Sequence, residues 1–237
     1  ALMLVLVWRH LPESLPQEQR QPFHPRAIVA QYISCLRHPR FVLLILMLAT
    51  AFAGFSLYIG SASHFIIDIL HLKETDFGWM FIPLVGGLIS GSAIASRLAH
   101  RLSRRTFVQT AFIIMAVAAI FNVSYNLMLG SEVRIPWAVL PLFIYSFGLS
   151  FLTPAVTMGA MDFFPHNQGL ASSLQSFTQM VVFATMAGVV VPLLFGSGLY
   201  LALGMAGMAI ASLVFYILFR VLHDRAAPPT LPPASSR

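Results

Sequence analysis

The chain has 237 residues, of which 58% are hydrophobic and 9% are charged, and its formal net charge is +6. A soluble domain usually carries about 25% charged residues, so this composition excludes a soluble globular protein and predicts an all-α membrane protein. The positive charge does not indicate nucleic-acid binding, because the arginines lie in loops between apolar runs. The single cysteine, Cys35, excludes an internal disulfide and a cysteine-based metal cluster in this chain.

The chain starts with an apolar stretch, 1–8, that spans about 12 Å as a helix and is too short to cross a membrane. We interpret it as the end of a preceding transmembrane helix, so that the chain is a fragment. Residues 9–40 hold five prolines and five arginines and are predicted to form a polar linker. Within this linker, apolar residues at helical spacing predict a short helix on the membrane surface: Ile28, Val29, Tyr32, Ile33 and Leu36.

Six apolar segments follow the linker, and each is long enough to cross an apolar core of about 30 Å. We predict transmembrane helices at 41–67, 77–96, 107–129, 137–158, 170–196 and 199–222, followed by a tail, 223–237. Three helices per unit invert the second unit, 137–222, relative to the first, 41–129, as in transporters with two inverted three-helix repeats. The predicted fold is therefore a bundle of six transmembrane helices.

The loop between the second and third segments predicts which side of the membrane each loop faces. Its arginines are Arg97, Arg101, Arg104 and Arg105. The flanking runs 77–95 and 107–129 contain no charged residue, and twelve of the fourteen Lys and Arg residues fall on the same side of the predicted topology as this loop. Because Lys and Arg accumulate in cytoplasmic loops, the linker and the tail are predicted to be cytoplasmic. Trp79 and Trp137 then fall at outer helix ends and Trp8 at an inner one.

Small residues and prolines recur inside the segments. Pairs of small residues four apart predict close helix packing: Gly87 with Gly91, Ala184 with Gly188, and Gly207 with Ala211. Three prolines are predicted to kink their helices: Pro83, Pro154 and Pro192. Together these features are typical of a bundle that changes conformation.

Four short stretches carry a resemblance to a known family: 11–16 (LPESLP), 20–24 (RQPFH), 162–166 (DFFPH) and 169–174 (GLASSL). They resemble the C-terminal half of Bcr/CflA-type multidrug efflux transporters of the major facilitator superfamily, which have twelve helices in two halves and a long cytoplasmic linker after the sixth. The resemblance implies that 1–8 is the end of helix six, that 9–40 is this linker and that 41–222 is a six-helix C-terminal transporter domain. An N-terminal half would then be its missing partner.

The arginine-rich loop also resembles a degenerate copy of the superfamily's G-x-L-a-D-R-x-G-R-R loop. The matching residues are Leu98, Arg101, Arg104 and Arg105. Ser96, His100 and Ser103 stand where the motif has Gly, Asp and Gly, and loss of the Asp puts a charge relay in doubt. The arginines are expected to pair with carbonyl groups at a helix C-terminus or with lipid phosphates, either as a conformational latch or as topogenic charge.

For function, the resemblance implies export of amphipathic drugs across a bacterial inner membrane in exchange for protons, with the proton gradient as energy source and no cofactor. A membrane-embedded carboxylate is the expected proton carrier. No Asp or Glu lies in the central portions of the six segments, so the coupling residues are expected in the missing N-terminal half. The local proton-relay candidates are His64 and Asp68, four residues apart at the outer end of the first segment; a solvated helix end is the alternative.

The family pattern places the substrate cavity against helices seven, eight, ten and eleven. Aromatic and amide side chains at mid-depth of these segments are the cavity candidates: Phe52, Phe55, Tyr58, Tyr145, Phe147, Gln175 and Gln179. This lining suits planar drugs with an apolar body and one polar group, and interhelical packing is the alternative for each residue. We assign Asn122 and Asn126 to helix contacts, and Asp162 to a cap at a helix end.

Other classes of protein are less well supported. The sequence has no H-E-x-x-H or G-x-S-x-G motif, no paired intramembrane aspartates and no phosphate-binding glycine loop, so an enzyme is disfavoured. A major facilitator carrier for a metabolite such as a sugar or nucleobase is one alternative, although sugar carriers usually have a more polar lining. A non-transporting six-helix assembly partner is another, and it would be favoured if the chain were complete.

Overall fold

The computed structural model describes residues 25–99, 101–130, 134–165 and 167–224. The predicted helix end 1–8, Trp8, the first half of the predicted linker and the tail beyond Asp224 lie outside these residues, as do the stretches 11–16 and 20–24 that carry part of the resemblance.

The chain divides into two compact units, 1–34 and 35–237. The described part of the first unit belongs to helix α2 (Pro25–Leu36), which confirms the helix predicted within the linker. Val29, Ile33 and Leu36 of this helix are exposed, and their spacing of four and three residues places them on one face. The placement of this face on a membrane surface stays a prediction.

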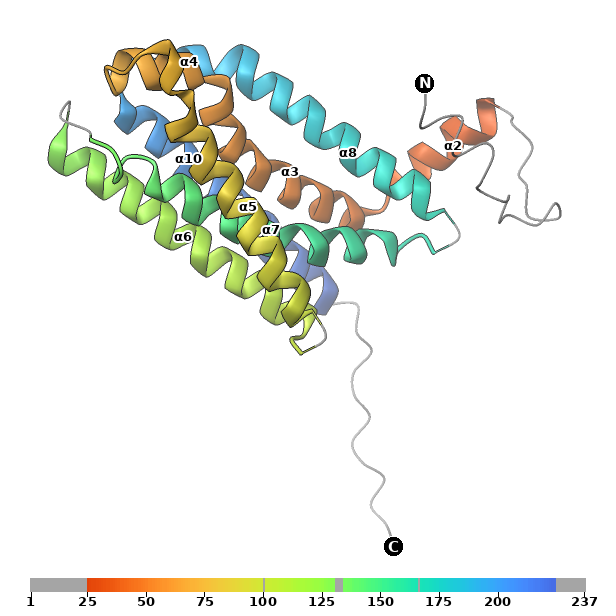
Figure 1. Cartoon of the computed structure of the whole chain (residues 1–237). Helices are drawn as coiled ribbons and strands as arrows, with labels where there is room; N and C mark the ends of the chain where they lie inside the picture. Colours follow the sequence, from red (N-terminus) through yellow and green to blue (C-terminus); the bar gives the residue numbers. More distant parts are fainter. Residues whose placement is uncertain (1–24, 100, 131–133, 166, 225–237) are drawn as a thin grey trace, which may run out of the picture. The chain divides into compact units, whose positions relative to one another are not determined.

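Six helical segments of the second unit are long and apolar enough to cross a membrane (Figure 1). They are α3 (Pro39–Gly60), a 3₁₀ turn (Glu74–Phe77) with α5 (Gly78–Leu98), α6 (Arg104–Leu129), α7 (Leu140–Met161), α8 (Gln168–Thr185) with a π-helical turn (Met186–Val190) and α9 (Val191–Leu193), and α10 (Gly198–Asp224). A short α4 (Ala62–His64) and a second π-helical turn (Phe65–Ile69) follow α3, and the described residues contain no strand. The six predicted segments are therefore confirmed.

Local sequence explains where several of these helices begin and end. The Nδ1 atom of His38 accepts a hydrogen bond from the backbone N–H of Phe41 at 3.4 Å and caps α3, which has Pro39 in its first turn. Ser103 caps α6 in the same way, because its Oγ accepts from the N–H of Thr106 at 3.2 Å. Helix α6 ends at Leu129 and is followed by the C-cap residue Gly130, whose positive φ of +58° favours glycine.

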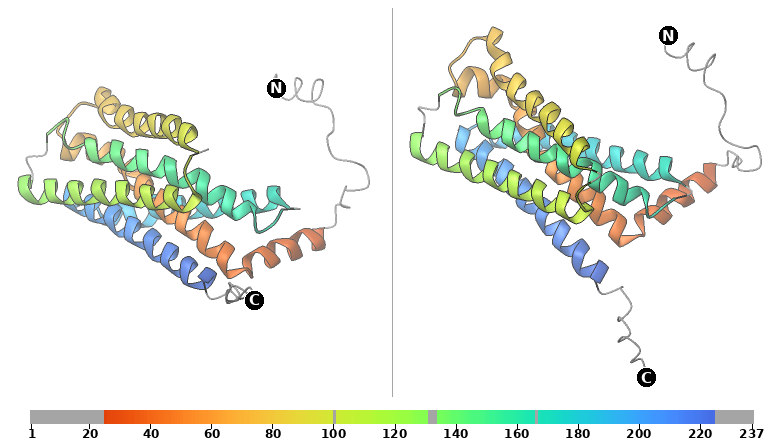
Figure 2. Two further views of the ribbon diagram at one scale, coloured as in Figure 1. Left: turned by 90° about the horizontal axis from the view of Figure 1, so that it is seen from below. Right: turned by 60° about the horizontal axis from the view of Figure 1, so that its bottom comes forward.

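Helices α3 and α7 are the most buried and pack between the other long helices, as Figures 1 and 2 show. The main partners of α3 are α10, α8 and α7, those of α7 are α6, α5 and α3, and α6 also packs against α10. Exchanging α3 with α7, α5 with α8 and α6 with α10 leaves these main contacts unchanged, although the smaller contact of α7 with α8 has no comparable counterpart between α3 and α5. Two inverted three-helix repeats require that symmetry, so the predicted repeat architecture is confirmed.

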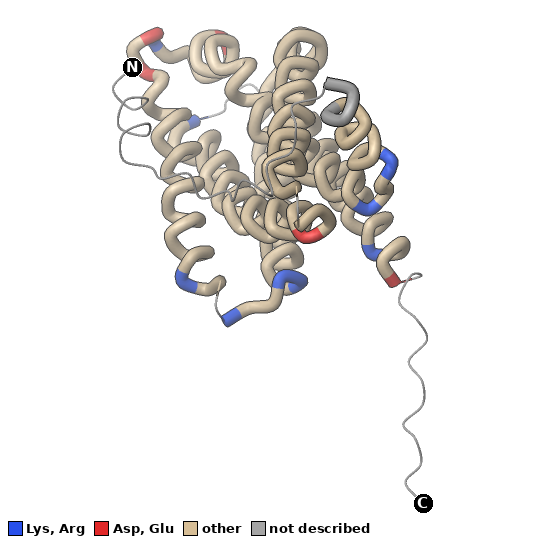
Figure 3. The backbone as a smooth tube through the Cα atoms, turned by 90° about the vertical axis from the view of Figure 1, so that its right-hand side faces the viewer, with Lys and Arg blue, Asp and Glu red and all other residues tan. Residues whose placement is uncertain are grey.

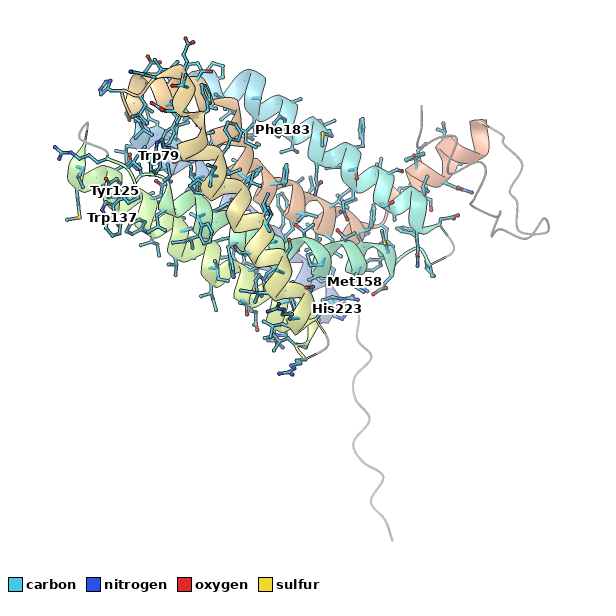
Figure 4. The ribbon with its side chains drawn as sticks, viewed as in Figure 1. Trp79, Tyr125, Trp137, Met158, Phe183 and His223 are labelled. Atoms are coloured by element: carbon cyan, nitrogen blue, oxygen red, sulfur yellow. The ribbon has the colours of Figure 1, made fainter. Side chains whose placement is uncertain are left out.

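Successive long helices run in opposite directions, so the loops gather at two ends of the bundle. The arginine end holds the loop 97–105, the α7–α8 loop and Arg220 near the end of α10, whereas the opposite end holds Lys73 and Arg134. Figure 3 shows the basic segments of the loops concentrated toward one end. Trp79 and Trp137 lie together at the opposite end (Figure 4) and are about half exposed, as expected for interfacial tryptophans.

One of the three predicted small-residue pairs forms a close helix contact. A Cβ atom on Gly91 would lie 2.8 Å from the carbonyl oxygen of Phe147, and one on Gly87 would overlap the carbonyl group of Phe143, so α5 and α7 meet backbone to backbone. The contacts predicted at Gly188 and Gly207 are wrong for this bundle. Both glycines are exposed, and no described atom of a neighbouring helix lies within 4 Å of a Cβ placed there.

Candidate functional site

A cavity of about 810 Å³ opens between α5 and α7 toward the arginine end, with Phe52 of α3 and Phe107 of α6 in its walls. Its lining is mainly apolar, and Met158, labelled in Figure 4, belongs to it. Five hydroxyl residues interrupt the apolar surface: Ser92 and Ser96 of α5, and Ser150, Thr153 and Thr157 of α7. We call this the hydroxyl cavity. Exposed polar residues are unfavourable in lipid, so these positions fit a protein-enclosed or water-filled space.

Three of the five hydroxyl groups of this cavity donate hydrogen bonds within their own helices. Ser96 Oγ donates to the carbonyl oxygen of Ala93 at 2.9 Å, and Thr153 Oγ1 donates to that of Leu149 at the same distance. Ser150 Oγ donates to a carbonyl one turn earlier at 2.8 Å. Because a hydroxyl oxygen keeps acceptor capacity after it has donated, these hydroxyl groups offer a ligand hydrogen-bond acceptors. Arg104 also lines the cavity and is paired with Asp162 at 2.7 Å.

Gln175 joins α8 to the wall of the hydroxyl cavity. Its Nε2 atom donates to Thr157 Oγ1 at 2.9 Å, and the residue is only 6% exposed. Its Oε1 atom is buried and has no hydrogen-bond partner among the described residues. A buried unpaired acceptor is costly, but Gln175 is not among the residues that line the cavity, so this amide joins α8 to the cavity wall and does not face a ligand.

Of the other phenylalanine and glutamine residues predicted to line the substrate cavity, one lines the hydroxyl cavity and three do not. Phe52 lines the hydroxyl cavity, and its ring centroid lies 5.2 Å from that of Phe55, which is buried behind it. Phe147 is half-buried and packs on Phe151 at a centroid distance of 5.4 Å. Gln179 is half-buried on α8, one turn beyond Gln175. A role of these residues in substrate binding stays a prediction.

Tyr58 and Tyr145 require a correction, because both are 1% exposed and hydrogen-bonded between helices rather than open to a cavity. The hydroxyl of Tyr145 donates to the carbonyl oxygen of Ala51 at 2.8 Å, joining α7 to α3. The hydroxyl of Tyr58 accepts from Nδ2 of Asn122 at 2.7 Å, joining α3 to α6. Asn126 donates to the carbonyl oxygen of Asn122 within α6 at 2.8 Å and packs against Gly198 of α10, so the assignment of both asparagines to helix contacts is confirmed.

At the arginine end, one residue of the loop motif forms an ion pair across the bundle. Arg104 donates to Asp162 Oδ2 at 2.7 Å, and Asp162 is the C-cap residue of α7, as predicted. A cation beside a helix C-terminus is favourable. Both side chains are at least half exposed, so the pair links α6 to α7 without adding much stability. Arg97 lies in the last turn of α5 and Arg101 in the turn that follows, whereas His100 is outside the described residues.

An aromatic cluster anchors the α7–α8 loop beside this ion pair. The ring of His38 lies 4.7 Å from that of Phe163, and Phe41 lies 5.2 Å from Phe164. Phe163 and Phe164 of the motif therefore tie the end of α7 to the start of α3.

At the opposite end, His64 and Asp68 form the predicted pair. His64 Nδ1 lies 2.7 Å from Asp68 Oδ2, which is hydrogen-bond distance. The imidazole ring stacks against Phe195, with 4.7 Å between ring centroids, and its Nε2 atom is buried without a partner among the described residues. The pairing is confirmed, and proton transfer through it stays a prediction.

Six membrane-crossing helices in inverted triplets, with an apolar cavity between them, define a polytopic α-helical membrane protein of the transporter type. Residues 1–187 match the family model described as Major Facilitator Superfamily. The chain therefore belongs to the major facilitator superfamily, and its six long helices correspond to one half of that fold.

A named relative is the "Multidrug resistance protein MdtM" of Salmonella typhimurium (strain LT2), which is 24% identical over 222 residues. The match covers 92% of this chain and 52% of the relative, so the chain spans about half of the relative's length.

The hydroxyl residues were missed by the sequence reasoning, which selected aromatic and amide groups. Their signal is the helical spacing of isolated hydroxyls in apolar segments: Ser92 and Ser96, then Thr153 and Thr157, are each four residues apart.

Proposed function

We propose that this chain is the C-terminal half of a twelve-helix, proton-coupled exporter of amphipathic drugs, of the Bcr/CflA type. The observation that carries this proposal is the hydroxyl cavity, which is apolar and presents few, separated acceptors. The printed name of the relative, a multidrug resistance protein, supports the same substrate class. A sugar or nucleobase carrier needs more hydrogen-bonding groups than this lining supplies.

The proposed substrate is a planar amphipathic compound with a hydrogen-bond donor or a cationic group. Its apolar body would pack on Phe52 and Met158, while its donor would meet the hydroxyl oxygens of the lining.

In the proposed topology, the arginine end faces the cytoplasm of a bacterial cell and the protein lies in the inner membrane. The concentration of Lys and Arg at this end supports that orientation. Residues 1–8 would then end a preceding helix, 9–40 would be a cytoplasmic linker, and 223–237 would be a cytoplasmic tail. The hydroxyl cavity would open toward the cytoplasm, which is the side from which an exporter loads its substrate.

Proton coupling is proposed to depend mainly on carboxylates in the other half of the transporter. Asp68, Glu74, Asp76, Asp162 and Asp224 are the acidic residues of the described chain, and each lies at a helix end or in a loop. His64 and Asp68 are the remaining local candidates, since they form a hydrogen-bonded pair at the outer end.

A transport assay with two neighbouring substitutions tests the function. Inverted membrane vesicles that contain the full-length protein are energised, ethidium or an amphenicol-like compound is added, and proton release is followed with a fluorescent pH probe. We expect release with the native protein, loss with Ser92→Phe, which fills the hydroxyl cavity, and retention with Ala93→Phe, because Ala93 is exposed on α5 outside the cavity lining.

The proposal fails if no such compound elicits proton release while a known antiporter responds in parallel vesicles. If both phenylalanine variants lose proton release equally, at equal protein levels, the hydroxyl cavity does not bind the transported compound.

The proton relay is tested separately with Asp68→Asn. If the pair carries protons, this variant lowers proton release more than drug binding, whereas Glu74→Gln, which removes a nearby charge outside the pair, changes neither. Unchanged proton release in Asp68→Asn would assign the pair to a structural role.

A further inference from the structure

A second pocket, of about 450 Å³, lies at the arginine end between α3, α6, α7 and α10. Its floor is apolar and comes from residues such as Leu44, Met47 and Phe219. Its rim is charged and contains Arg104, Arg105, Arg220, His223, Asp162 and Asp224. Figure 4 places His223 at this end of the bundle. We call it the basic pocket.

The charges of this rim do not cancel. Arg104 pairs with Asp162 at 2.7 Å, and Arg220 lies 3.7 Å from Asp224. Arg105 is exposed and has no ionic or hydrogen-bond partner among the described residues. The rim therefore carries one uncompensated positive charge before any protonation of His223, which suits a ligand with one negative charge.

An apolar groove of about 490 Å³ continues from the basic pocket between α6 and α10. On α6, Val108 of the pocket is followed one turn later by Phe112 and then by Met115 of the groove, so all three lie on one stripe of the helix. On α10, Tyr216 of the pocket and Leu213 of the groove are related in the same way. The rings of Phe112 and Tyr216 lie 5.5 Å apart where the two spaces meet.

The depths of these two spaces match the parts of a phospholipid. At about 1.5 Å per residue, Phe112 lies about 10 Å further into the bundle than Arg105 along α6, and Ile120 lies about 22 Å further. One leaflet of an apolar core of about 30 Å is about 15 Å thick. If Arg105 lies at headgroup level, Phe112 lies near the start of the acyl chains. The groove from Phe112 to Ile120 then extends about 12 Å along α6, which fits within one leaflet.

We propose that the basic pocket and the groove together bind one anionic phospholipid. Its phosphodiester would be held by Arg105 and Arg220, because guanidinium groups form paired, charge-assisted hydrogen bonds with phosphate oxygens. One acyl chain would lie in the groove between α6 and α10, against Met115 and Leu213. The net charge of the rim favours phosphatidylglycerol, whose headgroup carries one negative charge, over a zwitterionic lipid.

Native mass spectrometry of the full-length protein in detergent tests this proposal, with phosphatidylglycerol and phosphatidylcholine of identical acyl chains as probes. We expect phosphatidylglycerol to bind about tenfold more tightly than phosphatidylcholine. The double variant Arg105→Gln, Arg220→Gln is expected to lose this preference. The double variant Arg97→Gln, Arg101→Gln removes the same charge outside the pocket lining and is expected to keep it.

Two further measurements test whether the groove binds an acyl chain. Ala206→Phe narrows the groove and is expected to weaken both lipids, and glycerol 3-phosphate, which has no acyl chain, is expected not to displace phosphatidylglycerol. Equal binding of the two lipids, equal losses in the two arginine double variants, or displacement by glycerol 3-phosphate would each overturn the proposal. Thermal unfolding of every variant excludes loss of binding through misfolding.

Discussion

Replacement of Gly91 by alanine tests the contact that holds α5 against α7 beside the hydroxyl cavity. The new Cβ atom would overlap Ser150 Oγ and would lie 2.8 Å from the carbonyl oxygen of Phe147. The serine side chain can rotate, but the carbonyl belongs to the backbone of α7, so the two helices must separate. Overpacking of this kind costs about 1–3 kcal/mol, and the higher helix propensity of alanine returns about 1 kcal/mol.

Gly207→Ala is the matched control, because its Cβ atom meets no described atom of a neighbouring helix and gains the same propensity. The free energy of unfolding of the two variants, measured for the purified protein in mixed micelles, is therefore expected to differ by about 1–3 kcal/mol, with Gly91→Ala the less stable. A difference below about 0.5 kcal/mol, the usual spread for substitutions without a specific mechanism, would refute the close approach of α5 and α7.

Three further substitutions follow from the interhelical bonds. Tyr145→Phe removes the bond to α3 and is expected to lower the unfolding free energy by about 0.6–1.7 kcal/mol in the same micelle assay; no change would contradict a native bond. Asn122→Leu leaves the buried hydroxyl of Tyr58 without its donor and is expected to cost about 1–3 kcal/mol, so a neutral result would argue against the α3–α6 bond. Asp162→Asn breaks an exposed ion pair and is expected to cost less than about 1 kcal/mol; a larger loss would mean that the pair is shielded from solvent.

The number and position of the membrane-crossing helices could be predicted because both depend on the order of apolar and charged residues along the chain. Long apolar runs, broken by charged loops, fix six segments whatever their packing. The main departure is at the end of α3, which stops at Gly60, seven residues before the predicted boundary. The helix then resumes as α4 and a π-helical turn, and mean hydropathy does not detect such a break.

The site was harder to predict, since it depends on which face of each helix meets a neighbour. Tyr58 and Tyr145 have the composition of a cavity lining, but their hydroxyls bond across helix contacts. Gly207 has the spacing of a packing motif, yet it points away from the neighbouring helices. Conversely, His64 and Asp68 were predicted as a pair because an i, i+4 spacing on a helix brings side chains together without any tertiary information.

The most direct test of the account is the accessibility of the hydroxyl cavity to water and substrate in the full-length protein. Ser92→Cys, in a background without other cysteines, is labelled with a membrane-impermeant maleimide in inverted vesicles, with and without ethidium. Ile113→Cys on α6, which is 65% exposed in this chain and lies outside every cavity described above, serves as the lipid-facing control. We predict that Ser92→Cys is labelled rapidly, that ethidium slows its labelling, and that Ile113→Cys is not labelled. Equally slow labelling at both positions, or labelling of Ser92→Cys that ethidium leaves unchanged, would contradict a substrate cavity at this site.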